Sequence, residues 1–335
     1  NNRYGLIMGT YKEIRGTHIV SVTSDPPSPV NGQMWYNSTD KVVKGFTSSP
    51  VGSWSTGSSL NTARSNFGGA GANTEAALGF GGGPPPAPTA KNQTESWNGS
   101  TWTEVNDLNE KKAYVSGAGT YTSAIAAGGD QYTGTAESWN GSSWTNITDE
   151  PDGGNGYGSA GADSEDALFF GGYSTGGNAF NRYWNGSSWT ELGDLNTGRN
   201  NLTGAGKTYT AALAFGGATN PSTFKTETES FNGSSWTEVS DLNAGRAYFS
   251  GSGTNTSALA WGGAGPSRTA ATESWNGSAW TETGDLAAAR SGIAKGGAGA
   301  SNSSGLAYGG STGSDTGSTE EFVSPTTSTV TFTVS

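Results

Sequence analysis

The sequence has no cysteine, a single histidine and few charged residues for its length. Of its 335 residues 13% are charged, and no apolar run approaches the length needed to cross a bilayer, so we expect no membrane insertion. The absence of cysteine excludes disulfides, thiol chemistry and thiolate-bound metal. The formal net charge of -11 argues against nucleic acid as a partner, because phosphate binding needs clustered lysine and arginine. The chain begins Asn1-Asn2 without a recognisable signal peptide, which indicates a processed or trimmed product.

Recognisable catalytic groups are equally scarce. His18 is the single histidine, lies outside the repeats and has no nearby cysteine or histidine that could complete a metal site. Asp163, Glu165 and Asp166 cluster in one turn that could hold a cation, although a solvated acidic turn is the commoner outcome. We therefore expect no catalytic residue, no metal and no cofactor. Acidic residues that converge from several repeats could still form a glycan-cleaving site, so that alternative stays open.

Glycine and aromatic residues, by contrast, are abundant: 55 Gly and 12 each of Trp, Tyr and Phe. A chain rich in Gly, Ser and Thr could be disordered, but these aromatics fall at regular positions and supply the apolar area of a core. Helix-forming runs are almost absent. The composition therefore predicts many short strands joined by tight turns, which is an all-β fold.

A repeat organises most of the chain. A pair of glycines follows an apolar stretch six times, at intervals of 47, 43, 45, 46 and 47 residues. A tryptophan recurs with the same period, and a basic residue stands ten positions after it in every copy but the third. Periods of this length mark solenoids and propellers. The three landmarks are Gly81-Gly82, Gly128-Gly129, Gly171-Gly172, Gly216-Gly217, Gly262-Gly263 and Gly309-Gly310; Trp54, Trp102, Trp144, Trp189, Trp236 and Trp280; and Arg64, Lys112, Gly154, Arg199, Arg246 and Arg290.

Each copy reads as four short strands. In the fifth copy a glycine-rich stretch (251–254) precedes an apolar one (257–261), and two further stretches flank Asn276-Gly277. Small residues in the first stretch suit the crowded axis of a ring of sheets. Asn-Gly is a strong hairpin signal, for which we expect a type I′ turn with positive φ at both residues.

These residues resemble the kelch repeat, in which an apolar strand ends in Gly-Gly and is followed by an aromatic residue and then by a tryptophan. The resemblance covers residues 54–322 in six copies, with W-N-G or F-N-G where kelch repeats usually carry Tyr-Asp. It implies a six-bladed kelch-type β-propeller with four-stranded blades and a binding or structural role. The copper oxidases built on kelch propellers need cysteine and histidine, which these repeats lack.

The ring closes only if its last blade is shared between the two ends of the repeat region. Residues 291–322 would give the first three strands, and residues 54–60 the outer one, because Trp54 carries the ten-residue spacing to Arg64. The alternating segment 330–334 is a rival closing strand. The predicted domains are an N-terminal extension (1–46), the propeller (47–322) and a strand-like C-terminal tail (323–335).

The N-terminal extension carries a second resemblance. Residues 26–46, PPSPVNGQMWYNSTDKVVKGF, are similar to short G-x-x-W-Y-N stretches of bacteriophage tail-fibre and virion proteins. The alternative is an extra hairpin that covers the propeller edge. Strand-like segments at both chain ends could also dock on neighbouring virion or surface subunits by strand addition.

The recurrent aromatic and asparagine residues have structural explanations. Trp97 and Trp102 should lie on one face of a hairpin and pack against a neighbouring blade rather than form a sugar platform. The Asn-Gly-Ser sequences match the N-glycosylation acceptor, but turn chemistry alone explains them: Asn98, Asn140, Asn185, Asn232 and Asn276.

A glutamate recurs at one position of the repeat, except in the third copy. That copy has Arg182 in place of the glutamate and Gly154 in place of the basic residue. The joint change predicts structural ion pairs in the other copies: Arg64 with Glu95, Lys112 with Glu137, Arg199 with Glu229, Arg246 with Glu273, and Arg290 with Glu320.

The loops that follow the Gly pairs differ most in sequence and should share one face of the ring, where recognition is expected. Candidate ligand residues there are Tyr132, Tyr173, Phe180, Phe224, Lys225 and Arg268. The leading hypothesis is a non-enzymatic virion, tail or cell-surface protein, hence virion-borne or extracellular, that binds a host glycan or protein. The alternatives are a kelch-type adaptor for protein partners and a glycan-cleaving propeller.

Overall fold

The computed structural model describes residues 19–30, 32–48, 52–83, 89–129, 134–174, 178–220, 223–324 and 327–332, and every regular element among them is a β-strand. The predicted all-β class is therefore confirmed. The chain forms two compact units, one made of Asn1–Pro50 with Pro325–Ser335 and the other of Val51–Ser324. The larger unit contains the repeats.

The smaller unit combines both chain ends in one sheet. Its strands β1 (Val20–Val22), β2 (Met34–Asn37), β3 (Val42–Ser48) and β32 (Thr327–Phe332) stand in that order, with β1 parallel to β2 and the others antiparallel. Asp25 accepts hydrogen bonds from Asn37, Lys44 and the buried Trp35, which lower its pKa to about 2. Because β32 pairs with β3, the rival idea that the tail closes the ring of repeats is wrong.

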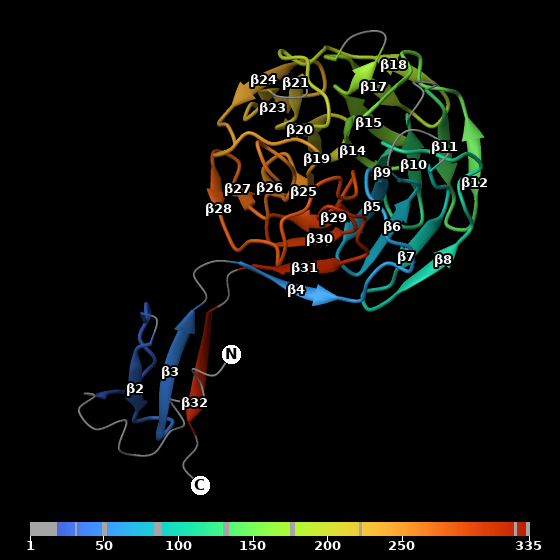
Figure 1. Cartoon of the computed structure of the whole chain (residues 1–335). Helices are drawn as coiled ribbons and strands as arrows, with labels where there is room; N and C mark the ends of the chain where they lie inside the picture. Colours follow the sequence, from blue (N-terminus) through green and yellow to red (C-terminus); the bar gives the residue numbers. More distant parts are fainter. Residues whose placement is uncertain are drawn as a thin grey trace. The chain divides into compact units, whose positions relative to one another are not determined.

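Six antiparallel four-stranded sheets lie in the larger unit (Figure 1). Sheet 1 is β5 (Gly68–Asn73), β6 (Ala76–Phe80), β7 (Thr94–Trp97) and β8 (Trp102–Val105); sheet 2 is β9 (Ser116–Gly119), β10 (Ala124–Ala127), β11 (Ala136–Trp139) and β12 (Trp144–Ile147). Sheet 3 is β14 (Gly158–Asp163), β15 (Asp166–Phe170), β17 (Asn181–Trp184) and β18 (Trp189–Glu191); sheet 4 is β19 (Thr203–Thr208), β20 (Ala211–Phe215), β23 (Thr228–Phe231) and β24 (Trp236–Val239). Sheet 5 is β25 (Ser250–Thr254), β26 (Ser257–Trp261), β27 (Thr272–Trp275) and β28 (Trp280–Glu282); sheet 6 is β29 (Ala298–Ser301), β30 (Ser304–Tyr308), β31 (Thr319–Val323) and β4 (Ser53–Gly57). Two short pairs lie in the connections: β13 (Gly154–Asn155) with β16 (Tyr173–Ser174), and β21 (Ala218–Asn220) with β22 (Thr223–Phe224).

The six sheets form a closed ring. Their first strands contact one another in a cycle, β5 with β9, β9 with β14, and so on to β29 with β5 (Figure 1). The predicted closing strand is confirmed, because β4 pairs with β31 and places Trp54 opposite Phe322. Glycine is needed in the first strands, since a Cβ on Gly117 would lie 2.2 Å from the carbonyl oxygen of Gly69.

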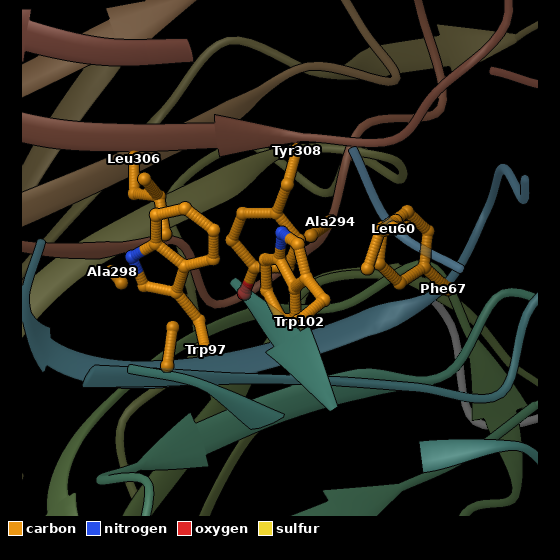
Figure 2. Packing of buried hydrophobic residues seen from close by; sticks show 9 residues of the cluster. Leu60, Phe67, Trp97, Trp102, Ala294, Ala298, Leu306 and Tyr308 are labelled. Atoms are coloured by element: carbon orange, nitrogen blue, oxygen red, sulfur yellow. The ribbon is translucent and has the colours of Figure 1, made fainter. Parts of the chain in front are cut away.

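Apolar cores fill the spaces between adjacent sheets. Figure 2 shows the core between sheets 6 and 1, where Trp97 and Trp102 pack against Leu306 and Tyr308, with the Trp102 and Tyr308 rings 4.9 Å apart. The prediction that the hairpin tryptophans are core residues is confirmed for those that are at most 6% exposed: Trp97, Trp102, Trp139, Trp144, Trp184, Trp236, Trp275 and Trp280.

The Asn-Gly hairpins are four-residue loops, so the predicted type I′ turn is wrong. In the first, residues 98–101 separate the paired Trp97 and Trp102, and of the Asn-Gly pair only Gly99 has a positive φ, 88°. The Asn98 side-chain oxygen accepts the backbone N–H groups of Ser100 and Thr101. The asparagine thus supplies an acceptor to the loop. The same bonds recur at Asn140, Asn185, Asn232 and Asn276.

The constant spacing of the landmarks follows from bonds between sheets. The second glycine of each pair donates its N–H to the carbonyl of the residue ten positions after the tryptophan, as Gly310 does to Arg64 at 2.8 Å. The Arg64 guanidinium in turn donates to the carbonyls of Gly81, directly after β6, and Gln93, directly before β7, both at the edge of sheet 1. One residue therefore joins two sheets, which fixes its place in the repeat.

Candidate binding groove

Six backbone hydrogen bonds form a closed circle around one end of the ring axis. Each joins a residue in the connection leading into one sheet to its equivalent in the next connection. This residue stands two places before the first strand in sheets 1 to 5 and six places before it in sheet 6. We call these residues the axial ring. The N–H groups donate as follows: Tyr114 to Asn66 (2.7 Å), Gly156 to Tyr114 (3.2 Å), Asn201 to Gly156 (2.9 Å), Tyr248 to Asn201 (3.0 Å), Gly292 to Tyr248 (2.7 Å) and Asn66 to Gly292 (2.8 Å).

All six axial-ring residues have a left-handed backbone, with φ between 52° and 69°. Glycine adopts this conformation without penalty, and asparagine tolerates it. Tyrosine does not favour it, because its Cβ crowds the following carbonyl. Tyr114 and Tyr248, both at φ 57°, are therefore unusual members of the ring.

A groove of about 770 Å³ borders the axial ring on the face of the variable loops. Asn66, Tyr114, Tyr248 and Gly292 line it from the axial ring. Its walls come from the loops at 264–268 and 311–315, which follow the Gly pairs of sheets 5 and 6. The connections between sheets and the loops after the Gly pairs therefore meet at one mouth.

Seven of the fifteen described residues that line the groove carry a hydroxyl group, and its charges are balanced. Its charged lining residues, among those that the structure describes, are Arg268, which is exposed, and Asp315. Asp315 accepts a hydrogen bond from Ser65 at 2.6 Å and lies 3.7 Å from the Lys91 amine. Burial raises the pKa of Tyr248 above its ordinary value of 10.0. The serines are Ser65, Ser267, Ser291, Ser311 and Ser314.

Arg268 is the one predicted ligand residue that lines the groove among those that the structure describes. The assignment of Phe180 to ligand binding is wrong. Its side chain is 4% exposed and packs edge-on against Tyr157 at 5.2 Å, in the core between sheets 2 and 3. Phe180 directly precedes β17, and its ring is stabilised by these apolar contacts rather than exposed to a ligand.

The remaining candidates lie elsewhere. Phe224 is partly buried, and Lys225 pairs with Glu227 at 2.6 Å; neither lines the groove. Tyr173 is 52% exposed and also lies outside it. Tyr132 falls outside the described residues, as does His18.

Sequence reasoning missed Tyr114 and Tyr248. A signal was present, since both follow a basic residue and an alanine at the same place in the repeat, as Lys112-Ala113-Tyr114 and Arg246-Ala247-Tyr248. The sequence does not show that the two tyrosines share a groove, because only closure of the ring brings the connections that precede sheets 2 and 5 to one mouth.

The predicted ion pairs are present and serve the structure rather than a ligand. Each joins the connection leaving one sheet to the third strand of the next. The carboxylate also accepts backbone N–H groups, such as that of Asn196 on Glu229 at 2.7 Å. The pairs are Arg64–Glu95 and Arg246–Glu273 in direct contact, Arg290–Glu320 at 2.9 Å, Arg199–Glu229 at 3.0 Å and Lys112–Glu137 at 3.8 Å.

In the third repeat the charges are reversed rather than lost. Arg182 stands on the strand, in contact with Asp152 and 3.8 Å from the buried Glu150 in the preceding connection. Glu150 accepts a hydrogen bond from the Tyr157 hydroxyl at 3.2 Å, and burial raises its pKa.

A buried lysine stands beside the axial ring. The Lys295 amine lies 3.5 Å from the side-chain oxygen of Asn201 and 3.4 Å from the carbonyl of Leu202, and burial lowers its pKa to about 7. The segment that carries Lys295 is longer than its equivalent in sheet 1. Nine positions separate the axial-ring residue Gly292 from Ser301 at the end of β29, whereas seven separate Asn66 from Asn73 at the end of β5.

Within the described ranges, no group of three or more His, Asp or Glu side chains is placed to hold a metal ion. No helix in the same ranges is long and apolar enough to cross a membrane.

Comparison with known proteins identifies the architecture. No protein-family model matches the sequence, and no curated protein does. The solved structure of YjhT is similar to this chain with a TM-score of 0.65 at 14% sequence identity, over 80% of this chain and 98% of that one. The fold is a β-propeller. At this identity the likeness bears on the fold alone, so the function of the propeller has to be argued from its groove.

Proposed function

We propose that this propeller is a non-enzymatic recognition protein that binds a host glycan in the groove at its mouth, as part of a phage virion or tail, or of a cell-surface adhesin. The observation that carries the proposal is the groove itself, about 770 Å³ in volume and lined by Tyr114, Tyr248 and five serines. Sugars present apolar ring faces and many hydroxyl groups. Aromatic faces and convergent hydrogen-bonding groups are suited to both.

The lining favours binding over cleavage. Glycoside hydrolysis ordinarily needs two carboxyl groups that flank the scissile bond. Among the described lining residues Asp315 is the single carboxylate, and it is engaged by Ser65 and Lys91.

In this proposal the six sheets are the blades of a kelch-type propeller, and the smaller unit docks on a neighbouring subunit. The recurring Gly pairs and tryptophans support the kelch assignment. β1 and β32 are the outer strands of the smaller sheet, and outer strands are suited to strand addition.

A glycan microarray probed with the purified chain tests the function. We expect selective retention of a group of glycans, lost in Ser267→Arg, which fills the groove, and kept in Ser142→Arg, which places the same side chain on an exposed Asn-Gly hairpin. Mass spectrometry of the retained glycan should show no cleavage. Absence of retention, or equal retention by both variants, would contradict binding in the groove.

A further inference from the structure

The axial ring has an internal two-fold pattern. Its residues read Asn66, Tyr114, Gly156 and then Asn201, Tyr248, Gly292. In a circle of six, identical residues three steps apart stand on opposite sides of the axis. The two tyrosines are therefore opposed, and Asn66 and Gly292 lie between them on the side of the groove.

The backbone conformation at these two positions does not require tyrosine. The same left-handed conformation is held by glycine at two axial-ring positions and by asparagine at two others. Tyrosine there costs conformational energy, and such strained residues cluster at functional sites. Tyr114 and Tyr248 are partly exposed and line the groove. We therefore attribute the choice of tyrosine at these two positions to a role of its side chain in the groove.

Resting on the glycan-binding function above, we propose that Tyr114 and Tyr248 are paired stacking platforms for a neutral, linear oligosaccharide that lies across the mouth. Sugar units at the two ends of the bound segment would stack on the two tyrosines. The units between them would meet Asn66 and the serines of the walls. A chain spanning both tyrosines fits the two-fold pattern better than a single terminal sugar.

The charges favour a neutral ligand. Among the described residues that line the groove, Arg268 and Asp315 carry opposite charges. The chain as a whole has a formal net charge of -11, which disfavours approach of a polyanion. A polyanionic glycan would need a basic cluster that this lining does not present.

The test uses maltooligosaccharides and β-1,4-linked N-acetylglucosamine oligomers of two to six units, together with any neutral linear glycan retained on the array, titrated by calorimetry. Affinity of the unchanged protein for a binding series should rise with chain length. Tyr114→Asn or Tyr248→Asn should abolish that rise and weaken binding of the longest oligomer by about tenfold or more. Tyr114→Phe and Tyr248→Phe should retain the length dependence, and Tyr121→Asn, an exposed tyrosine that does not line the groove, should change nothing.

The variants separate this inference from the proposed function. Asparagine already occupies two axial-ring positions, so the Tyr→Asn variants should keep the melting temperature of the unchanged protein. Suppose that Ser267→Arg abolishes binding but neither Tyr→Asn variant weakens it. This result would show that the tyrosines are not stacking platforms, while the groove would remain the glycan site. Affinity that is independent of chain length, or a preference for heparin fragments, would also overturn the stacking platforms. Retention of no glycan on the array would instead remove the function on which the inference rests.

Discussion

At the scale of single residues, buried charges recur because backbone groups between the sheets need partners. Arg246 donates to the carbonyls of Gly262 and Ala271, while Glu273 accepts the N–H of Asn243 and contacts Arg246. Both charged side chains are at most 2% exposed. Each is therefore tolerated only because the other is present.

Replacing one member of such a pair should be costly. Glu273→Gln leaves the Arg246 guanidinium buried without its counter-charge, and we expect the free energy of unfolding to fall by roughly 3–5 kcal/mol. Urea unfolding measures the change. Glu227→Gln removes the partner of the more exposed Lys225 and should cost about 1 kcal/mol or less. Equal losses in the two variants would show that burial does not decide the effect.

Lys295 should make stability depend on pH. Burial lowers its folded-state pKa from 10.5 to about 7. Between those values the unfolded chain holds a proton that the folded chain has lost, so stability rises with pH through this window, by up to about 1.4 kcal/mol per pH unit. Lys295→Met should remove this slope and stabilise the protein at neutral pH. Unfolding in urea at pH 7, 8 and 9 compares the two proteins, and parallel curves would contradict the assignment.

At the scale of elements, tryptophan–threonine hydrogen bonds join neighbouring sheets. The indole N–H of the outer strand donates to the threonine that begins the third strand of the preceding sheet, at Trp102–Thr319, Trp144–Thr94, Trp280–Thr228 and Trp54–Thr272, over 2.9 to 3.1 Å. Between sheets 3 and 4 the threonine is replaced by Asn181. Within the described residues, neither the Trp236 indole nitrogen nor the Asn181 side-chain oxygen has a hydrogen-bond partner.

Asn181→Thr should restore the missing bond. We expect the free energy of unfolding to rise by about 0.5–1.5 kcal/mol, the net worth of a hydrogen bond, as measured by chemical denaturation. Thr228→Asn makes the opposite change beneath Trp280 and should lower stability by a similar amount. A destabilised Asn181→Thr would show that Asn181 contributes more through its bond to the Gly193 carbonyl.

The elements also show how far sequence reasoning reaches. The repeat predicted the strands, the closing role of Trp54 and the ion pairs, because each depends on a residue that returns at a fixed spacing. The Asn-Gly turn type was not predictable in this way, since a four-residue loop and a type I′ turn share the same dipeptide. Phe180 was misassigned because its burial depends on Tyr157 and not on its own loop.

The candidate site was harder to predict from the sequence than the fold. Tyr114 and Tyr248 are 134 positions apart by their numbering, and only closure of the ring brings them to one groove. Their left-handed backbone is likewise a property of the axial ring. The sequence placed the candidate loops on the face where the groove lies and included Arg268 among its lining residues, but it did not point to the two tyrosines.

At the scale of the whole molecule, the first and last repeats are joined in one sheet. Trp54 packs against Trp261 and Phe322 at 5.4 and 5.2 Å, and its strand covers the edge of sheet 6. Deleting residues 54–60 should therefore expose that edge and lower the melting temperature well below that of a variant lacking loop residues 265–267. Calorimetry compares the two, and similar losses would show that closure does not govern stability.

The central claim is that the mouth of the propeller is its binding surface, and hydrogen exchange of the full chain with and without a glycan retained on the array tests it most directly. Bound glycan should slow exchange of backbone amides at 264–268 and 311–315 and around Tyr114 and Tyr248, and leave the Asn-Gly hairpins unchanged. Protection confined to those hairpins or to the smaller unit, with none at the mouth, would contradict the account.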